Sequence, residues 1–199
     1  MAFAKGVVSS VLKKLGAALF VAAALAGAWL LVHFGISTYY RAVYPDRYHS
    51  YVQQYSRQYD LPPELVYGVI YTESRFNPQA VSRVGARGLM QLMEETFEWA
   101  RYRAGDPQEM EYDSMFDPET NIRYGSYTLS LLLEEFGSVE TALCAYHAGW
   151  GNVKKWLANS KYSDDGSTLR LIPYSDTQFY VDKVKKTADI YKKLYRRQL

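Results

Sequence analysis

The hydrophobic and polar positions divide the chain into one long apolar run and a remainder with helical periodicity. Residues 15–36 are apolar except for small residues and His33. These 22 residues would form a helix about 33 Å long at about 1.5 Å per residue. The hydrocarbon core of a membrane is about 30 Å thick, so the run is long enough to cross it. We predict a transmembrane signal-anchor helix at 15–36, a connector at 37–47 and an extracytoplasmic domain at 48–199.

Charge around the apolar run predicts its orientation. All three charged residues before position 37 are lysines, and all lie within residues 1–14. Positive charge favours the cytoplasmic side, so we expect a short cytoplasmic basic head at 1–14. The chain would then cross the cell membrane once, with the rest outside. A cleaved signal peptide is the alternative, because Ala26-Gly27-Ala28 offers small residues of the required kind, although the apolar run continues past them.

Helical spacing of apolar residues recurs through the rest of the chain. Prolines, glycines and capping residues mark where the helices begin and end. The first helix is expected from Pro45 towards Tyr59. Further helices are expected at 63–74, 89–102, 117–136, from 138 to the glycines at 149 and 151, and from 175 to near the C-terminus. Residues 161–171 form an expected polar loop. Since no segment shows sustained alternation of polar and apolar residues, the predicted fold is mostly α-helical.

Composition excludes several classes of protein. The chain is 48% hydrophobic and 22% charged, which is too apolar for a disordered chain. Its formal net charge of +2 gives no indication of a nucleic-acid partner. One cysteine excludes a disulfide scaffold and a cysteine-based zinc site. The three histidines are scattered. We therefore expect no metal ion and no cofactor.

Glu73 is the residue whose position most needs an explanation. It follows Val66 and Ile70 on the apolar stripe of the helix expected at 63–74. It also lies at the C-terminal end of that helix, where the helix dipole disfavours a negative charge. Both effects raise the pKa of a carboxyl group. A carboxyl group that stays protonated near neutral pH can serve as a general acid. Rotation into solvent, or pairing with Arg75, is the alternative.

Four blocks of sequence support a catalytic role for this glutamate. In chain order they read ESRFNP at 73–78, SRVGARGLMQ at 82–91, YHAGWGNV at 146–153 and IPYSDTQFYV at 172–181. Together they resemble the catalytic domain of the soluble-lytic-transglycosylase family, which has a lysozyme-like fold. The resemblance covers roughly residues 52–191. It implies that the domain at 48–199 is a lysozyme-like transglycosylase catalytic domain preceded by a transmembrane helix.

The resemblance implies cleavage of the MurNAc–GlcNAc β-1,4 bond in peptidoglycan. In this family one glutamate acts as acid and then as base, and Glu73 matches it. The sugar's own 6-hydroxyl attacks the anomeric carbon and leaves a 1,6-anhydroMurNAc end. Glycosidases usually need a second carboxylate. An enzyme whose substrate supplies the nucleophile does not need one. The expected partners are therefore a peptidoglycan strand and the membrane.

The same resemblance implies a set of substrate-binding residues. In the glycine-containing loop these are Ser82, Gly85, Met90 and Gln91. Glycines allow close approach of the backbone to a ligand, and methionine sulfur packs well on flat faces. Gln91 stands within an apolar run, where a polar side chain needs a partner. The alternative is that the apolar residues of this segment belong only to the core.

Three further positions are expected in the sugar groove, and two of them depart from the family pattern. Tyr146 matches a tyrosine whose hydroxyl lies near the catalytic acid. His147 stands where the family usually has asparagine, and Asp176 stands where it commonly has glutamate. Trp150 replaces a proline that usually separates the two glycines. Each has a structural alternative, since a histidine or tryptophan can simply pack and Asp176 can cap a helix.

Two other functions remain open from the sequence. A goose-type-lysozyme-like hydrolase would use the same scaffold, with water in place of the 6-hydroxyl. A peptidoglycan-binding scaffold without catalytic activity is the second alternative. The intact Glu73 argues against the scaffold, whereas the altered residues at His147 and Asp176 favour it.

Overall fold

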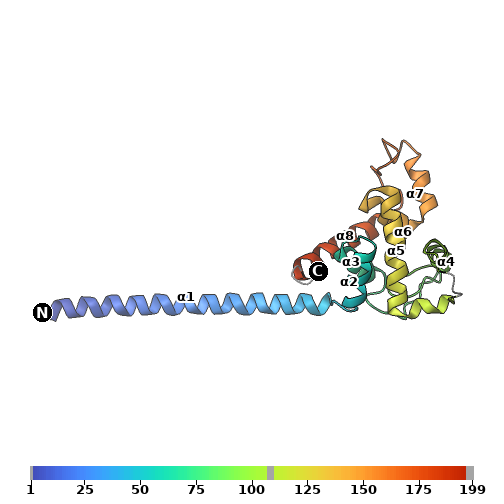
Figure 1. Ribbon diagram of the computed structural model, residues 1–199. Coiled ribbons are helices and arrows are strands. Elements are labelled where there is room, and N and C mark those ends of the chain that lie inside the picture. Colours follow the sequence, from blue (N-terminus) through green and yellow to red (C-terminus); the bar gives the residue numbers. More distant parts are fainter. Residues whose placement is uncertain (1, 107–109, 196–199) are drawn as a thin grey trace. The chain divides into compact units, whose positions relative to one another are not determined.

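The computed structural model describes residues 2–106 and 110–195 as helices joined by turns and loops (Figure 1). No β-strand occurs within these residues, which confirms the mostly α-helical fold expected from the sequence. Two compact units are present, at 1–45 and 46–199.

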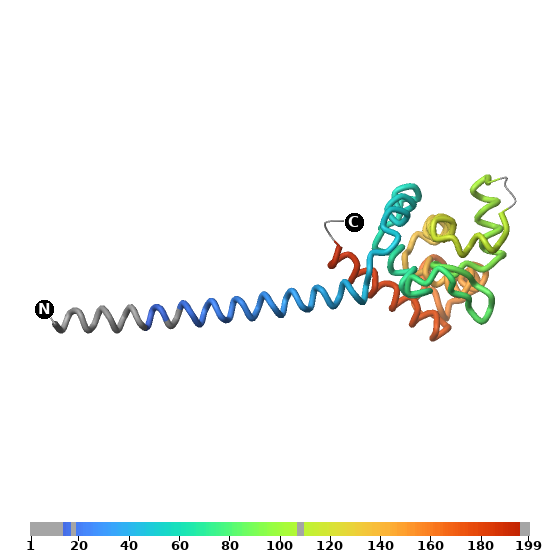
Figure 2. Tube along the Cα trace, turned by 90° about the horizontal axis from the view of Figure 1, so that it is seen from below, coloured from blue at the N-terminus to red at the C-terminus, as the bar shows by residue number. Residues whose placement is uncertain are grey.

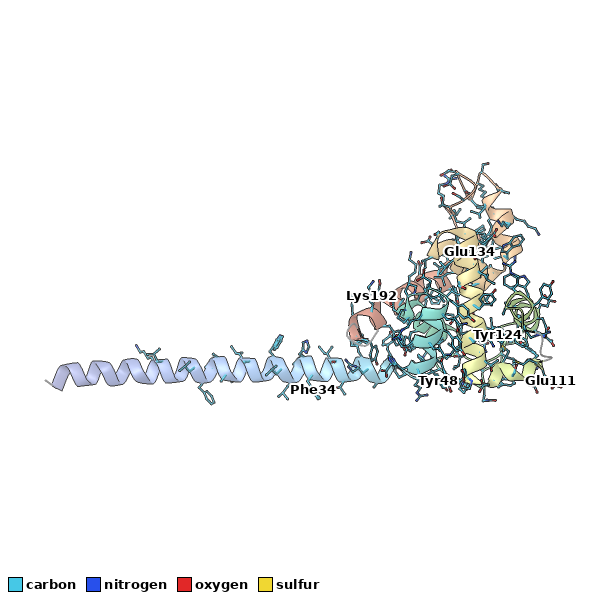
Figure 3. The ribbon with its side chains drawn as sticks, viewed as in Figure 1. Phe34, Tyr48, Glu111, Tyr124, Glu134 and Lys192 are labelled. Atoms are coloured by element: carbon cyan, nitrogen blue, oxygen red, sulfur yellow. The ribbon has the colours of Figure 1, made fainter. Side chains whose placement is uncertain are left out.

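The first unit consists of one helix, α1 (Ala2–Val43). Its segment Lys14–Val43 has a mean hydropathy of 2.3 and is long and apolar enough to cross a membrane. Large apolar side chains such as Phe34 project from it into the surroundings (Figure 3). The helix continues seven residues beyond the expected end at Ile36, so part of the expected connector at 37–47 is helical. Pro45 explains where α1 stops, because the residue before a proline avoids the helical conformation.

The second unit contains one short 3-10 helix and seven α-helices within the described residues. In chain order they are α2 (His49–Gln58), α3 (Pro63–Glu73), α4 (Glu94–Arg103), η1 (Tyr112–Phe116), α5 (Pro118–Phe136), α6 (Val139–Ala148), α7 (Trp150–Leu157) and α8 (Ser175–Tyr195). Helix α5 runs through the middle of this unit (Figure 1), and Figure 2 traces α8 as the red helix along one side.

Local capping signals account for most of these boundaries. The Asp117 side chain accepts a hydrogen bond from the Thr120 backbone N–H at 2.8 Å, and α5 ends at Gly137 with φ of 63°. The expected helices at 63–74, 117–136 and from 175 are confirmed as α3, α5 and α8 to within one residue. The helix expected from 138 to the glycines at 149 and 151 is confirmed as α6, which ends before the first of these glycines.

Three elements differ from the sequence prediction. Helix α2 begins at His49 and not at Pro45. Helix α4 begins at Glu94 and not at residue 89, because Leu92 still pairs with Arg87 in an antiparallel bridge. Helix α7 was not expected. Gly149 ends α6, and the chain forms a second helix directly from Trp150. This helix carries Val153, Trp156 and Leu157 on its buried face.

Helices α3 and α8 form the most extensive helix pair of the unit. Gly68 lies at their contact, where a Cβ atom would be 2.9 Å from the Val184 carbonyl oxygen. A glycine at this position lets the two backbones approach closely. Helix α8 buries the apolar residues that recur along it at helical spacing; they are Val181, Val184, Ala188, Tyr191 and Tyr195. This close crossing sets the first half of α8 beside the C-terminal end of α3.

Candidate active site

Glu73 is the last residue of α3 and its side chain is half-buried. Burial raises the pKa of its carboxyl group from 4.5 to about 7, and the Tyr180 hydroxyl and the Lys183 charge partly oppose that shift. The direction is the one expected from the sequence, with burial as the main cause. Near neutral pH a large fraction of Glu73 is therefore protonated and able to donate a proton.

Two tyrosine side chains face the Glu73 carboxyl group. Tyr180 comes from α8 and is buried. Its hydroxyl is close enough to lower the pKa of Glu73, although it makes no hydrogen bond of normal geometry. Tyr146 comes from α6, and its hydroxyl donates a hydrogen bond to the Met90 carbonyl at 2.8 Å. Burial and the Glu73 charge raise the pKa of both tyrosines well above 10. Both remain neutral hydroxyls beside the acid.

The chain makes a sharp turn directly after Glu73. Arg75 and Phe76 both have positive φ, at 50° and 64°, a conformation that costs free energy in residues other than glycine. Burial of Phe76 holds this turn, since its ring packs against Tyr67 and Tyr191 with centroids 6.1 and 6.4 Å away. The strained turn is thus fixed by the core, and Glu73 is fixed with it.

The glycine-containing loop packs against the end of α3. The Ser74 hydroxyl donates a hydrogen bond to the Leu89 carbonyl at 2.7 Å. Within the loop, the Ser82 hydroxyl accepts from the Ala86 N–H at 3.0 Å. Gly85 lies at the tip with φ of 91°. Ser82 is therefore part of the loop's own turn, and Gly85 leaves its backbone open on one side.

Gln91 has partners inside the protein. Its side-chain amide donates to the carbonyls of Ala80 and Gly88, at 3.0 and 2.9 Å. The sequence analysis expected the substrate to be the hydrogen-bond partner of this side chain, but these two carbonyls already fill that role. The residue also lines the cleft described below, so it connects the loop to that cleft.

Asn121 on α5 holds the glycine-containing loop in place, a role that the sequence analysis did not predict. Its side chain accepts a hydrogen bond from the Met90 N–H at 2.7 Å and donates to the carbonyls of Arg87 and Met115, at 3.0 and 2.9 Å. It is fully buried. Asn121 is the fourth residue of α5, and nothing local in the sequence distinguishes it from an exposed polar residue near a helix start. The signal for this role is therefore its burial, which requires hydrogen-bond partners.

Met90 occupies a different place from the one expected. Its side chain is fully buried and fills space against Gly125 of α5, so its sulfur cannot form a wall of the groove. Only its backbone takes part, through Tyr146 and Asn121. Met93, three residues later, is 39% exposed and lines the cleft. The structure therefore gives to Met93 the position that the sequence analysis gave to Met90.

A cleft of about 830 Å³ opens between α4, α5 and the junction of α6 with α7. Gln91 and Tyr146 lie in its wall together with Met93. Glu73 does not line it directly. Its carboxyl group is close enough to Tyr146, in the cleft wall, for its charge to raise the pKa of that tyrosine.

His147 and Asp176 lie close to each other, and His147 contacts Tyr180. The imidazole stacks on the Tyr180 ring, with centroids 4.5 Å apart, and its Nδ1 lies 3.1 Å from the Thr177 hydroxyl. Burial lowers the pKa of His147, and the Asp176 charge opposes that shift. Asp176 is exposed and accepts a hydrogen bond from the Thr177 N–H at 2.8 Å. Tyr180, which connects this pair to Glu73, belongs to the fourth sequence block but was not singled out.

Comparison with known proteins agrees with this geometry. The profile of the family described as the transglycosylase SLT domain matches residues 50–168. The soluble lytic murein transglycosylase of Escherichia coli K12 is 33% identical over 143 residues, which cover 71% of this chain and 22% of the relative. A transglycosylase of Enterobacteria phage PRD1 is 42% identical over 106 residues, covering 53% of this chain and 36% of the relative. The chain thus spans about a fifth to a third of these relatives.

Solved structures are similar over a comparable part of the chain. The soluble lytic transglycosylase SLT70 of Escherichia coli matches with a TM-score of 0.69 and 28% identity, over 77% of this chain and 25% of its own. An inactive glutamate-to-glutamine mutant of lytic transglycosylase Slt from Pseudomonas aeruginosa matches with a TM-score of 0.66 and 29% identity, over 75% and 24%. These similarities confirm the lysozyme-like fold. The family match covers more than half of the residues, and the chain belongs to the transglycosylase SLT domain family.

Proposed function

We propose that this chain is a membrane-anchored peptidoglycan lytic transglycosylase that cleaves the MurNAc–GlcNAc β-1,4 bond and leaves a 1,6-anhydroMurNAc end. The observation that carries the proposal is the Glu73 carboxyl group, with its pKa raised to about 7 and neutral tyrosine hydroxyls beside it. The named activity of the relatives supports it, as does a relative inactivated by replacing one glutamate.

In the first step Glu73 acts as the general acid. Its proton passes to the bridging oxygen, and the bond between that oxygen and C1 of MurNAc breaks. The GlcNAc residue leaves with a free 4-hydroxyl group. Burial keeps the Glu73 carboxyl group protonated until the substrate is bound. The positive charge that develops at C1 as the bond breaks then stabilises the carboxylate that remains.

In the second step the Glu73 carboxylate acts as the general base. It takes the proton of the MurNAc 6-hydroxyl while that oxygen forms a bond to C1. The product is the 1,6-anhydro ring, and Glu73 is protonated again, now by the proton of the 6-hydroxyl. Neutral hydroxyls of Tyr146 and Tyr180 add no second negative charge to the site during this exchange.

The mass of the product separates this reaction from hydrolysis on the same scaffold. Purified peptidoglycan is digested with the full chain in detergent, and the released muropeptides are analysed by mass spectrometry. Transglycosylation gives ends that are one water lighter than the ends left by hydrolysis. Products with only the heavier ends would show a goose-type-lysozyme-like hydrolase and would contradict the proposal.

The Glu73→Gln variant separates an enzyme from a binding scaffold. Glutamine keeps the shape of the side chain but cannot donate a proton at neutral pH, so we expect cleavage to fall at least about 100-fold. Pull-down on insoluble peptidoglycan should be retained. Unchanged cleavage would show that Glu73 is not the acid.

The proposed anchor is α1, with the N-terminus in the cytoplasm. The apolar segment Lys14–Val43 and the lysines before it support this orientation. Cell fractionation should place the chain in the membrane, and protease added outside spheroplasts should degrade the second unit. Release of a shortened soluble form would instead show a cleaved signal peptide.

A further inference from the structure

Trp99 and Trp150 are the two tryptophans of the second unit that are not buried in the core. Trp99, on α4, is 42% exposed, and Trp150, the first residue of α7, is 52% exposed. Trp156 is by contrast 6% exposed and packs edge-on against Tyr174, with centroids 4.9 Å apart. Both exposed indoles line the cleft of about 830 Å³. They enter it from different helices, so the cleft has an aromatic side chain on two of its walls.

A basic side chain holds each indole ring. The Arg103 guanidinium lies 5.9 Å from the Trp99 ring centroid, and the Lys154 ammonium lies 5.2 Å from that of Trp150. Lys154 is itself paired with Glu135 of α5. Such cation–π contacts restrain the rings before a ligand arrives, and a restrained ring loses less entropy on binding.

The rest of the cleft suits a sugar. Carboxylates of Glu95, on α4, and Glu134, near the end of α5 (Figure 3), lie in its wall among apolar side chains. Ligand sites commonly combine aromatic walls with a few polar groups that fix orientation. A pyranose ring has apolar C–H faces for the indoles and equatorial hydroxyls that can donate hydrogen bonds to carboxylates.

The cleft shares Tyr146 with the candidate active site. Tyr146 lies in the cleft wall and is close enough to Glu73 to be affected by its charge, and Gln91 of the glycine-containing loop lines the same cleft. A glycan strand whose scissile bond is at Glu73 would extend along the cleft towards the two tryptophans. We propose that Trp99 and Trp150 form an aromatic clamp that binds a sugar ring of the glycan strand away from the scissile bond. This inference rests on the proposed function, because it takes peptidoglycan as the ligand.

Binding to the Glu73→Gln chain tests the clamp without turnover. The full chain in detergent is titrated calorimetrically with a two-sugar muropeptide and with long glycan strands. Trp99→Ala and Trp150→Ala should each weaken binding of the long strands by about tenfold. Trp150→Phe should restore part of the loss, because phenylalanine also stacks. Tyr102→Ala is the matched control, since Tyr102 is 82% exposed on the same helix as Trp99 and lies outside the cleft.

Each outcome of this experiment decides between the clamp and its competitors. If both alanine variants bind long strands as tightly as the parent chain, the clamp is overturned and the proposed function is left intact. A loss seen only with peptide-bearing strands, and not with strands stripped of peptides by an amidase, would show a site for the peptide stem and overturn the sugar clamp. Absence of binding by any variant to any glycan would overturn the clamp and the proposed function together.

Discussion

The imidazole ring of His147 stacks on the phenol ring of Tyr180 with the centroids 4.5 Å apart. The Thr177 hydroxyl, also on α8, lies within hydrogen-bond distance of the imidazole. His147 therefore has two contacts with this helix. The Tyr180 hydroxyl in turn affects the Glu73 carboxyl group. His147, one of the residues that depart from the family pattern, is therefore separated from the proposed acid only by the Tyr180 ring. A histidine here contributes to the orientation of Tyr180.

The proposed reaction should lose rate as the pH rises through about 7. The first step needs protonated Glu73, whose pKa is about 7, so kcat/KM should fall about tenfold per pH unit well above that value. We call this fall in kcat/KM the alkaline limb of the pH profile. The His147→Asn variant should keep it. If the limb disappeared in that variant, His147 would be the titrating group and the assignment to Glu73 would be wrong.

Tyr180→Phe should move the alkaline limb to higher pH. The Tyr180 hydroxyl lowers the pKa of Glu73, so its removal raises that pKa while the ring can still stack on His147. Little stability should be lost, since this buried hydroxyl has no hydrogen bond of normal geometry. Tyr55→Phe is the control, because the Tyr55 hydroxyl bonds to Glu119 and not to Glu73. A limb that stayed in place, or moved to lower pH, would contradict the proposed contact.

Glu73→Gln should stabilise the protein at alkaline pH only. The folded-state pKa is raised from 4.5 to about 7, so the folded state binds the proton more tightly and stability falls as the pH rises between these values. The shift corresponds to at most about 3 kcal/mol. Glutamine carries no such penalty, and Tm should rise by several degrees at about pH 8.5. At about pH 4 the two proteins should unfold together. A higher Tm at both pH values would point to packing instead of charge.

Local signals in the sequence were sufficient for much of the fold. Asp117 and Pro118 begin α5, Gly137 ends it, and the spacing of apolar residues on α8 identifies its buried face, because each of these features acts within a turn or two of helix. Glu73 was predictable for the same reason. Its apolar stripe and its place at a helix end are both properties of one helix.

The partners of Glu73 depend on contacts between distant segments. Tyr180 reaches the acid only because Gly68 lets α8 approach α3. Asn121 and Met90 meet across 31 residues, and no local pattern distinguishes buried Met90 from exposed Met93. Helix α7 was missed because a glycine that ends one helix does not show whether another begins directly after it.

Gly88 and Gly85 provide a matched test of how the glycine-containing loop is fixed to α5. Both have positive φ, at 78° and 91°, so alanine strains the backbone at either position by about 1 kcal/mol. The two positions differ in what surrounds the added Cβ atom. At Gly85 it meets nothing within 4 Å, whereas at Gly88 it would collide with the Met115 carbonyl and the Asn121 amide.

Only the Gly88 collision disturbs the hydrogen bonds that Asn121 makes to the loop. Gly85→Ala should therefore lower Tm by about 2–4 °C and leave most activity. Gly88→Ala should lower it by more than about 10 °C, because at least two buried polar groups lose their partners as well, and the loop beside Glu73 should become accessible to protease. Thermal unfolding and limited proteolysis measure both effects. Equal losses in the two variants would show that Asn121 does not hold this loop in place.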